Sequence, residues 1–153
     1  MMQVKEVMSR QVISIDASDS CLEAVGRMHR SRVRHLPVVD RGKRLLGIIT
    51  DRDLRHHLFS PAVFPALGMS SMDTLLKAAS VADLMTTDVV TVGPDETLGE
   101  AARLMLERKV GSLPVLEDGR VVGILTETDM LRLIVRSDAC APECAEVIVS
   151  FPS

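Results

Sequence analysis

The stretch Gly-Ile-Ile-Thr-Asp-Arg-Asp-Leu, residues 47–54, returns later in the chain as Gly-Ile-Leu-Thr-Glu-Thr-Asp-Met, residues 123–130. In both stretches a glycine and two apolar residues lead to a threonine, and an aspartate follows three residues later. Thr-x-x-Asp is a form of capping box, in which the threonine and the acid satisfy free N–H groups at a helix start. The pattern therefore predicts, twice, a buried strand that runs directly into a helix.

The recurrence extends over most of the 153 residues. Shifting the sequence by 77 residues aligns 4–39 with 81–116, and one additional residue in the first copy then changes the shift to 76. Repetition of this length indicates duplicated structural units. We assign a first repeat, a linker with a short helix, a second repeat and a tail to residues 1–58, 59–80, 81–136 and 137–153.

Each repeat reads as β-α-β-β-α. The β-branched runs Val12–Ile15 and Val89–Val92 predict first strands. Ser20-x-x-Glu23 and Thr97-x-x-Glu100 are capping boxes that predict the next helix. The remaining predicted strands are Leu36–Val39, Leu45–Ile49, Leu113–Leu116 and Val121–Leu125, with tight turns at Gly42 and Gly119.

Packing of the repeats follows from their size. One copy is too small to bury both faces of its sheet, so we expect two copies to pack sheet to sheet with pseudo-two-fold symmetry and to share a core. The fold class is α/β. In the linker, Met72, Leu75, Leu76 and Ala79 fall on one helical face and predict a short helix that packs on this core.

Composition and charge exclude several classes of protein. No apolar run is long enough for a signal peptide or a membrane span, and three cysteines make no disulfide framework, so we expect a cytoplasmic protein.

Residues 1–57 hold 11 Lys/Arg against 7 Asp/Glu, whereas the whole chain has a net charge of −3. This balance, and the lack of Tyr and Trp, argues against nucleic-acid binding but permits a local anion site. Nucleophile–base pairs and glycine-rich phosphate loops are absent from the sequence, so an enzyme is not expected.

The repeats resemble a tandem pair of CBS domains, the modules named after cystathionine β-synthase. The resemblance rests on Val-Met at 7–8 and Leu-Met at 84–85, on Leu-Pro-Val at 36–38 and 113–115, and on the two Gly-Ile-x-Thr-x-x-Asp motifs. It implies a free-standing regulatory module without an obligatory cofactor. Such modules bind adenosine compounds (AMP, ADP, ATP and others) in two clefts between the copies, form homodimers through their helices, and signal to a protein partner.

The resemblance also implies site residues by position. Thr50 and Asp53 would contact phosphate and ribose in one pocket, and Thr126 and Asp129 in the other. The purine is expected against aliphatic and main-chain groups of the strands. The other candidates lining these pockets are Ile13, Val33, Arg34, Ile48, Arg52, Val90, Val110, Gly111, Ile124 and Thr128.

The two pockets differ in the cations available to them. Arg34, Arg52 and Arg55 lie near the first motif, whereas the second offers Thr128 and Leu131 at the places of the last two, and Gly111 at the place of Arg34. Phosphate needs cationic partners beside an aspartate, so we predict that the Asp53 pocket favours phosphorylated ligands.

Simpler interpretations remain open for several of these features. Thr-x-x-Asp can cap a helix and do nothing else, in which case the chain is a structural dimerisation module with vestigial clefts. Apart from Arg34, the basic run at 29–35 is expected to be a solvated face. His56 and His57 are expected on a helix surface, and Cys140 and Cys144 as free thiols and not zinc ligands.

Overall fold

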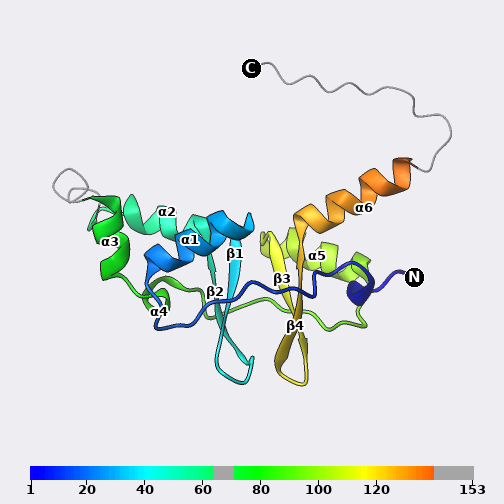
Figure 1. Ribbon diagram of the computed structural model, residues 1–153. Coiled ribbons are helices and arrows are strands. Elements are labelled where there is room, and N and C mark those ends of the chain that lie inside the picture. The colour runs from blue at the N-terminus through cyan, green and yellow to red at the C-terminus, as the bar shows by residue number, and fades with distance from the viewer. Residues whose placement is uncertain (64–70, 140–153) are drawn as a thin grey trace, which may run out of the picture.

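The computed structural model describes residues 1–63 and 71–139 of the chain, and it contains two β-hairpins with helices packed beside them (Figure 1). The first repeat holds η1 (Val4–Glu6), α1 (Cys21–Ser31), β1 (His35–Val39), β2 (Leu45–Thr50) and α2 (Asp51–Leu58). The linker and second repeat hold α3 (Met72–Ala78), α4 (Val81–Leu84), α5 (Leu98–Arg108), β3 (Ser112–Glu117), β4 (Arg120–Thr126) and α6 (Glu127–Ala139). The predicted α/β class and twofold repetition are confirmed.

The two hairpins have the same register. In the first, Leu36 pairs with Ile49 and Val38 with Gly47, and in the second the pairs are Leu113 with Leu125 and Val115 with Gly123. Both have an irregularity one residue later. The hairpins meet near their turns, where the amide of Val121 donates to the carbonyl of Lys43 at 3.0 Å.

The predicted first strands at Val12–Ile15 and Val89–Val92 do not form as strands. Only Ile15 and Val92 pair with a hairpin, each through a single parallel bridge, to Val38 and Val115. The reason is that each segment spans both repeats: Ser9 pairs with Ile124 on β4 before the chain reaches β1. We call the extended runs at 9–15 and 86–92 the crossing segments, because each contacts one hairpin at its start and the other at its end. Most of their residues therefore lack a continuous strand partner.

The predicted capping boxes before α1 and α5 form only in part. Ser20 Oγ accepts from the amide of Glu23 at 3.1 Å, and Thr97 Oγ1 accepts from that of Glu100 at 3.2 Å. The Glu23 carboxylate, however, pairs with Arg27 at 2.8 Å instead of returning to the helix start, and Glu100 pairs with Arg103. A nearby arginine on the same helix face thus replaces the second half of the box.

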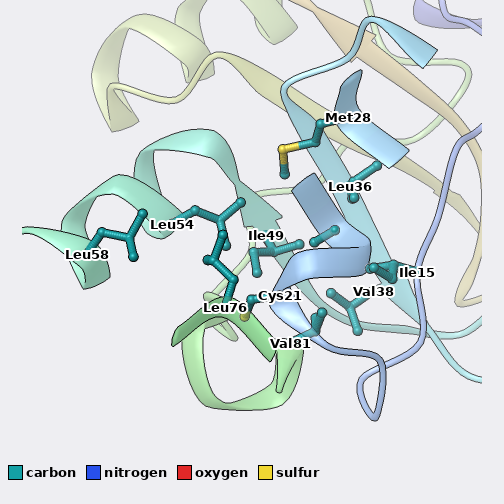
Figure 2. Packing of buried hydrophobic residues seen from close by; sticks show 11 residues of the cluster. Ile15, Cys21, Met28, Leu36, Val38, Ile49, Leu54, Leu58, Leu76 and Val81 are labelled. Carbon is teal, nitrogen blue, oxygen red and sulfur yellow. The ribbon is translucent and has the colours of Figure 1, made fainter. Parts of the chain in front are cut away.

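The buried side chains form two clusters, which corrects the expectation of one shared core. The first repeat's cluster includes Val81 from α4, and the second repeat's cluster includes Val4 from η1. Figure 2 shows Val81 beside Cys21 and Leu76 in the first cluster. Each repeat therefore completes its neighbour's core with its own first turn, and this exchange ties the repeats into one body.

The predicted linker helix is present as α3 and packs on the first cluster. Leu76 is 4% exposed, and Leu75 and Ala79 pack against the cluster. Met72 is 49% exposed, so it does not belong to the buried face as predicted. Among the described residues, no helix has the length and apolar composition that a membrane span requires. Cys140 and Cys144 lie outside the described residues.

Candidate functional site

The Thr50–Asp53 motif forms a complete capping box at the start of α2. The Asp53 amide donates to Thr50 Oγ1 at 3.2 Å. In return, Oδ2 of Asp53 accepts from the Thr50 amide at 2.9 Å and from its hydroxyl at 3.0 Å. The capping box fixes the rotamer of Asp53 and engages one of its two carboxylate oxygens in hydrogen bonds. In the described part of the chain, Oδ1 of Asp53 has no hydrogen-bond partner, and it can accept from a ligand.

The Thr126–Asp129 motif repeats this geometry at the start of α6. Oδ2 of Asp129 accepts from the Thr126 amide and hydroxyl, both at 2.9 Å, and Thr126 Oγ1 accepts from the Asp129 amide at 3.2 Å. Its second oxygen lies 3.8 Å from a guanidinium nitrogen of Arg132. The capping role is therefore established for both motifs. It leaves one carboxylate oxygen of each without a hydrogen bond within the described residues, and in Asp129 this oxygen faces Arg132.

The glycine that opens each motif allows a crossing segment to lie against the strand. A Cβ at Gly47 would stand 2.8 Å from the Thr86 carbonyl oxygen, and one at Gly123 would stand 3.1 Å from the Ser9 carbonyl oxygen. These segments are hydrogen-bonded there, with the Thr86 amide donating to the Ile48 carbonyl at 2.8 Å. The close approach brings residues from both repeats to the strand ends where the capping boxes sit.

Both motifs open into one cleft of about 840 Å³ between the repeats, whereas two separate pockets were expected. Every sequence-predicted site residue lines it. These residues are Ile13, Val33, Arg34, Ile48, Thr50, Arg52, Asp53, Val90, Val110, Gly111, Ile124, Thr126, Thr128 and Asp129. Apolar side chains and capped aspartates from both repeats therefore face the same space.

Sequence reasoning missed several polar residues of the cleft. Arg32 and Lys109 occupy equivalent places at the ends of α1 and α5, both in the left-handed conformation, with φ of 54° and 53°. The repeat alignment carries this signal, since both copies have a cation at that position. The other missed lining residues are Ser9, Gln11, His35, Asp51, Thr86, Asp88, Val89, Ser112, Glu127 and Arg132.

Charge is unequal between the two sides of the cleft. The first repeat contributes four arginines and two aspartates, at positions 32, 34, 52, 55 and 51, 53. The second contributes two cations and three acids, at positions 109, 132 and 88, 127, 129. Arg55 is paired with Asp51 at 3.2 Å, whereas Arg32, Arg34 and Arg52 form no ion pair within the described residues. The first repeat's side is thus the cationic one.

His35 lines the cleft from β1 and lies close to Gly111 of the second repeat. Burial lowers the pKa of its imidazole below the usual 6.5, with a smaller contribution from Arg34, while Asp51 and Glu127 act in the opposite direction. The neutral form therefore prevails at pH 7. A Cβ at Gly111 would stand 3.3 Å from His35 Nε2 and 3.4 Å from Glu127 Oε2. A larger residue there would have to displace both side chains; Gly111 occupies the place equivalent to Arg34 of the first repeat.

In the basic run at 29–35, His29, Arg30 and Arg32 are exposed as expected, but Arg32 also lines the cleft, and His35 is half-buried and lines it together with Arg34. Their contribution depends on the turn after α1, which the sequence pattern does not fix. His56 is exposed on α2 as predicted. Among the residues the structure describes, no group of three or more His, Cys, Asp or Glu side chains is placed to hold a metal ion.

The chain is similar to known proteins over both repeats. A family model described as the CBS domain matches residues 4–60 and 81–136. A CBS domain-containing protein of Dictyostelium discoideum is 36% identical over 136 residues, which cover 87% of this chain and 91% of that protein. The chain spans less than half the length of several other curated relatives.

Two similar solved structures hold adenosine compounds. CBSX2 of Arabidopsis thaliana, in complex with AMP, is 28% identical with a TM-score of 0.73, over 90% of this chain and 99% of that one. The domain pair of protein MJ0100, in complex with 5′-methylthioadenosine and S-adenosyl-L-methionine, is 29% identical with a TM-score of 0.71. That match covers 90% of this chain and 98% of the other.

Proposed function

The chain belongs to the CBS domain family, and we propose on this basis that it is a regulatory module that binds an adenosine-containing ligand between its repeats. The observation that carries the proposal is the cleft: both capped aspartates line one space of about 840 Å³, together with apolar and charged side chains of both repeats. That volume is typical of small-molecule sites. The complexes of CBSX2 with AMP and of MJ0100 with adenosine compounds support the ligand class.

Each group in the cleft has a role in this proposal. The free oxygens of Asp53 and Asp129 accept from the two hydroxyls of a ribose, since an ionised carboxylate is an acceptor only. Thr50 and Thr126 hold these carboxylates in place. Aliphatic side chains contact the purine, namely Ile13, Val33, Ile48, Val90, Val110 and Ile124.

Phosphate groups of the ligand are assigned to the first repeat's side. Arg34 and Arg52 are exposed and without a protein ion pair within the described residues, so they are available to an anion. Thr128 and Gly111 stand near the equivalent places on the other side and carry no charge. We therefore propose that AMP, ADP or ATP is preferred there, and that an uncharged adenosyl compound suits the Asp129 side.

Signalling requires that the ligand bind two arrangements of the protein with different affinities. Exposed apolar residues on α5 and α6 provide a surface through which the arrangement of a homodimer can be read by a protein partner. They are Leu106 (80% exposed), Leu131 (62%), Ile134 (56%) and Val135 (68%). The same residues favour the second candidate function, a dimerisation module without a ligand. We assign the chain no catalytic activity, and a cytoplasmic location stays a prediction.

The discriminating experiment is a thermal-shift panel with adenosine, AMP, ADP, ATP, S-adenosylmethionine and NADH. A bound ligand raises Tm in proportion to the logarithm of its concentration over Kd. We expect a rise with at least one adenosine compound, and we expect Asp53→Ala or Asp129→Ala to diminish it. No shift with any compound at millimolar concentration would favour the dimerisation module.

The matched control for these substitutions is Asp83→Ala. Asp83 also closes a capping box, with its Oδ2 accepting from the Ser80 amide at 3.0 Å, but it does not line the cleft. The three variants lose the same kind of cap, worth about 1 kcal/mol. Only the loss of a ligand contact separates Asp53→Ala and Asp129→Ala from Asp83→Ala. If the ligand raises Tm equally in all three variants, the two aspartates do not contact the ligand.

A further inference from the structure

A second recess, of about 530 Å³, adjoins the cationic side of the cleft at the end of α1. It is lined by Met28, His29, Arg30, Arg32, Val33 and Arg34. Arg32, Val33 and Arg34 also line the cleft, so the two hollows share this wall. Three arginines and a histidine thus line an open recess beside the proposed phosphate position.

The turn after α1 weakens the usual objection to an anion at a helix C-terminus, which is the negative end of the helix dipole. Arg32 adopts the left-handed conformation, and its amide donates to the carbonyl of His29 at 3.4 Å. The next amide, of Val33, donates to the carbonyl of Met28 at 3.0 Å. These two carbonyls are satisfied, and the side chains around them are basic.

The second repeat has no equivalent of this basic cluster. The residues equivalent to His29, Arg30, Arg32 and Arg34 are Leu106, Glu107, Lys109 and Gly111. Only one of the four is a cation, and Glu107 is paired with Arg103 at 2.8 Å. The recess therefore distinguishes the two ends of the cleft more sharply than the Thr-x-x-Asp motifs do.

We propose that the recess receives the terminal phosphates of an adenosine ligand, so that the first repeat's side recognises an extended phosphate chain such as that of ATP. The inference rests on the proposed function of the cleft. The first phosphate lies beside Arg34, and the chain passes Arg32 into the recess. Glu23, paired with Arg30 at 3.1 Å, partly offsets the charge of that arginine. Arg32 and Arg34 have no ion pair within the described residues and are the main anion partners.

The test compares Kd values for adenosine, AMP and ATP, measured by calorimetry without divalent cations, and for inorganic tripolyphosphate. In the natural protein we expect ATP to bind about tenfold more tightly than AMP, as a few partly exposed charge-assisted contacts provide. The variant Arg30→Gln/Arg32→Asn removes two cations, and asparagine tolerates the left-handed conformation. It should reduce the preference for ATP to about twofold, weaken tripolyphosphate binding, and leave adenosine binding unchanged.

The control is Lys77→Gln/Arg108→Gln, which removes two exposed cations that line neither hollow. It should keep the preference for ATP. Equal affinity for AMP and ATP in the natural protein would overturn the recess assignment and leave the proposed function standing if adenosine binds. The assignment would also be overturned if the Arg30→Gln/Arg32→Asn variant lost the same factor in affinity for adenosine as for ATP. It would be overturned as well if this variant and the control lost the same factor in affinity for ATP. If tripolyphosphate binds through these arginines but no adenosine compound binds, the recess is an anion site only, and both the recess assignment for an adenosine ligand and the proposed function fail.

Discussion

Replacing Gly47 with alanine should destabilise the protein, because the added methyl group has no room beside the crossing segment. It would lie 2.8 Å from Sδ of Met85 and 2.8 Å from the carbonyl oxygen of Thr86. The methionine side chain is flexible and can move away. The carbonyl cannot move freely, because it accepts from the Ile48 amide at 2.9 Å, and the Thr86 amide donates back at 2.8 Å.

The magnitude follows from these contacts. Separating the segment from β2 weakens two hydrogen bonds worth about 1 kcal/mol each, and overpacking of this kind costs about 1–3 kcal/mol. We expect the free energy of unfolding to fall by about 2 kcal/mol, which for a chain of this length lowers Tm by about 4–8 °C. Urea and thermal denaturation followed by circular dichroism measure both quantities.

Gly99→Ala is the matched control. Gly99 is exposed near the start of α5, and its nearest neighbour to an added Cβ is Thr97 Oγ1 at 3.9 Å. Alanine there has room and a higher helix propensity, so stability should stay equal or rise by up to about 1 kcal/mol. If Gly47→Ala proves as stable as the natural protein, the argument from the close approach of the crossing segment is refuted.

Three further predictions concern the cap, the buried histidine and the exposed helix face. Thr126→Ala should lower the free energy of unfolding by about 1 kcal/mol in urea titrations, and an unchanged midpoint would contradict the capping role. The lowered pKa of His35 means that the native state binds fewer protons than the unfolded state, so stability should hold above pH 6.5 and fall as the pH drops below it. His35→Gln should flatten this dependence in denaturation series between pH 5 and 8, and an identical slope would exclude His35 as its source. The proposed homodimer predicts that Leu131→Asp/Ile134→Asp leaves the monomer fold intact and shifts light scattering from dimer to monomer, whereas a dimer that persists would place the interface elsewhere.

The repeat and its motifs were predictable from sequence because their signals are local. A capping box needs only two residues three apart, and the structure has it at both Thr-x-x-Asp motifs. The alternation of apolar runs and turn residues likewise predicted both hairpins. The positional resemblance then selected residues that all line one cleft, although their binding roles stay predictions.

The features that the sequence did not predict depend on contacts between distant residues. The exchange of Val4 and Val81 between the two cores depends on the path of the crossing segments. A local sequence pattern does not indicate that path. The short pairing at Ile15 has the same cause. The sequence pattern predicts a solvated face for Arg32 and His35, because a basic run has the same sequence pattern on an exposed surface as along the wall of a cleft. Only the turn at Arg32 decides between them.

The most direct test of the central claim is a titration of the ¹⁵N-labelled protein with AMP, followed by amide chemical shifts. We expect saturable shifts at the starts of α2 and α6, foremost at Thr50, Asp53, Thr126 and Asp129, with little change in α3. Shifts confined to other surfaces, or no shifts up to several millimolar AMP, adenosine and ATP, would contradict the claim that the cleft between the repeats binds adenosine-containing ligands.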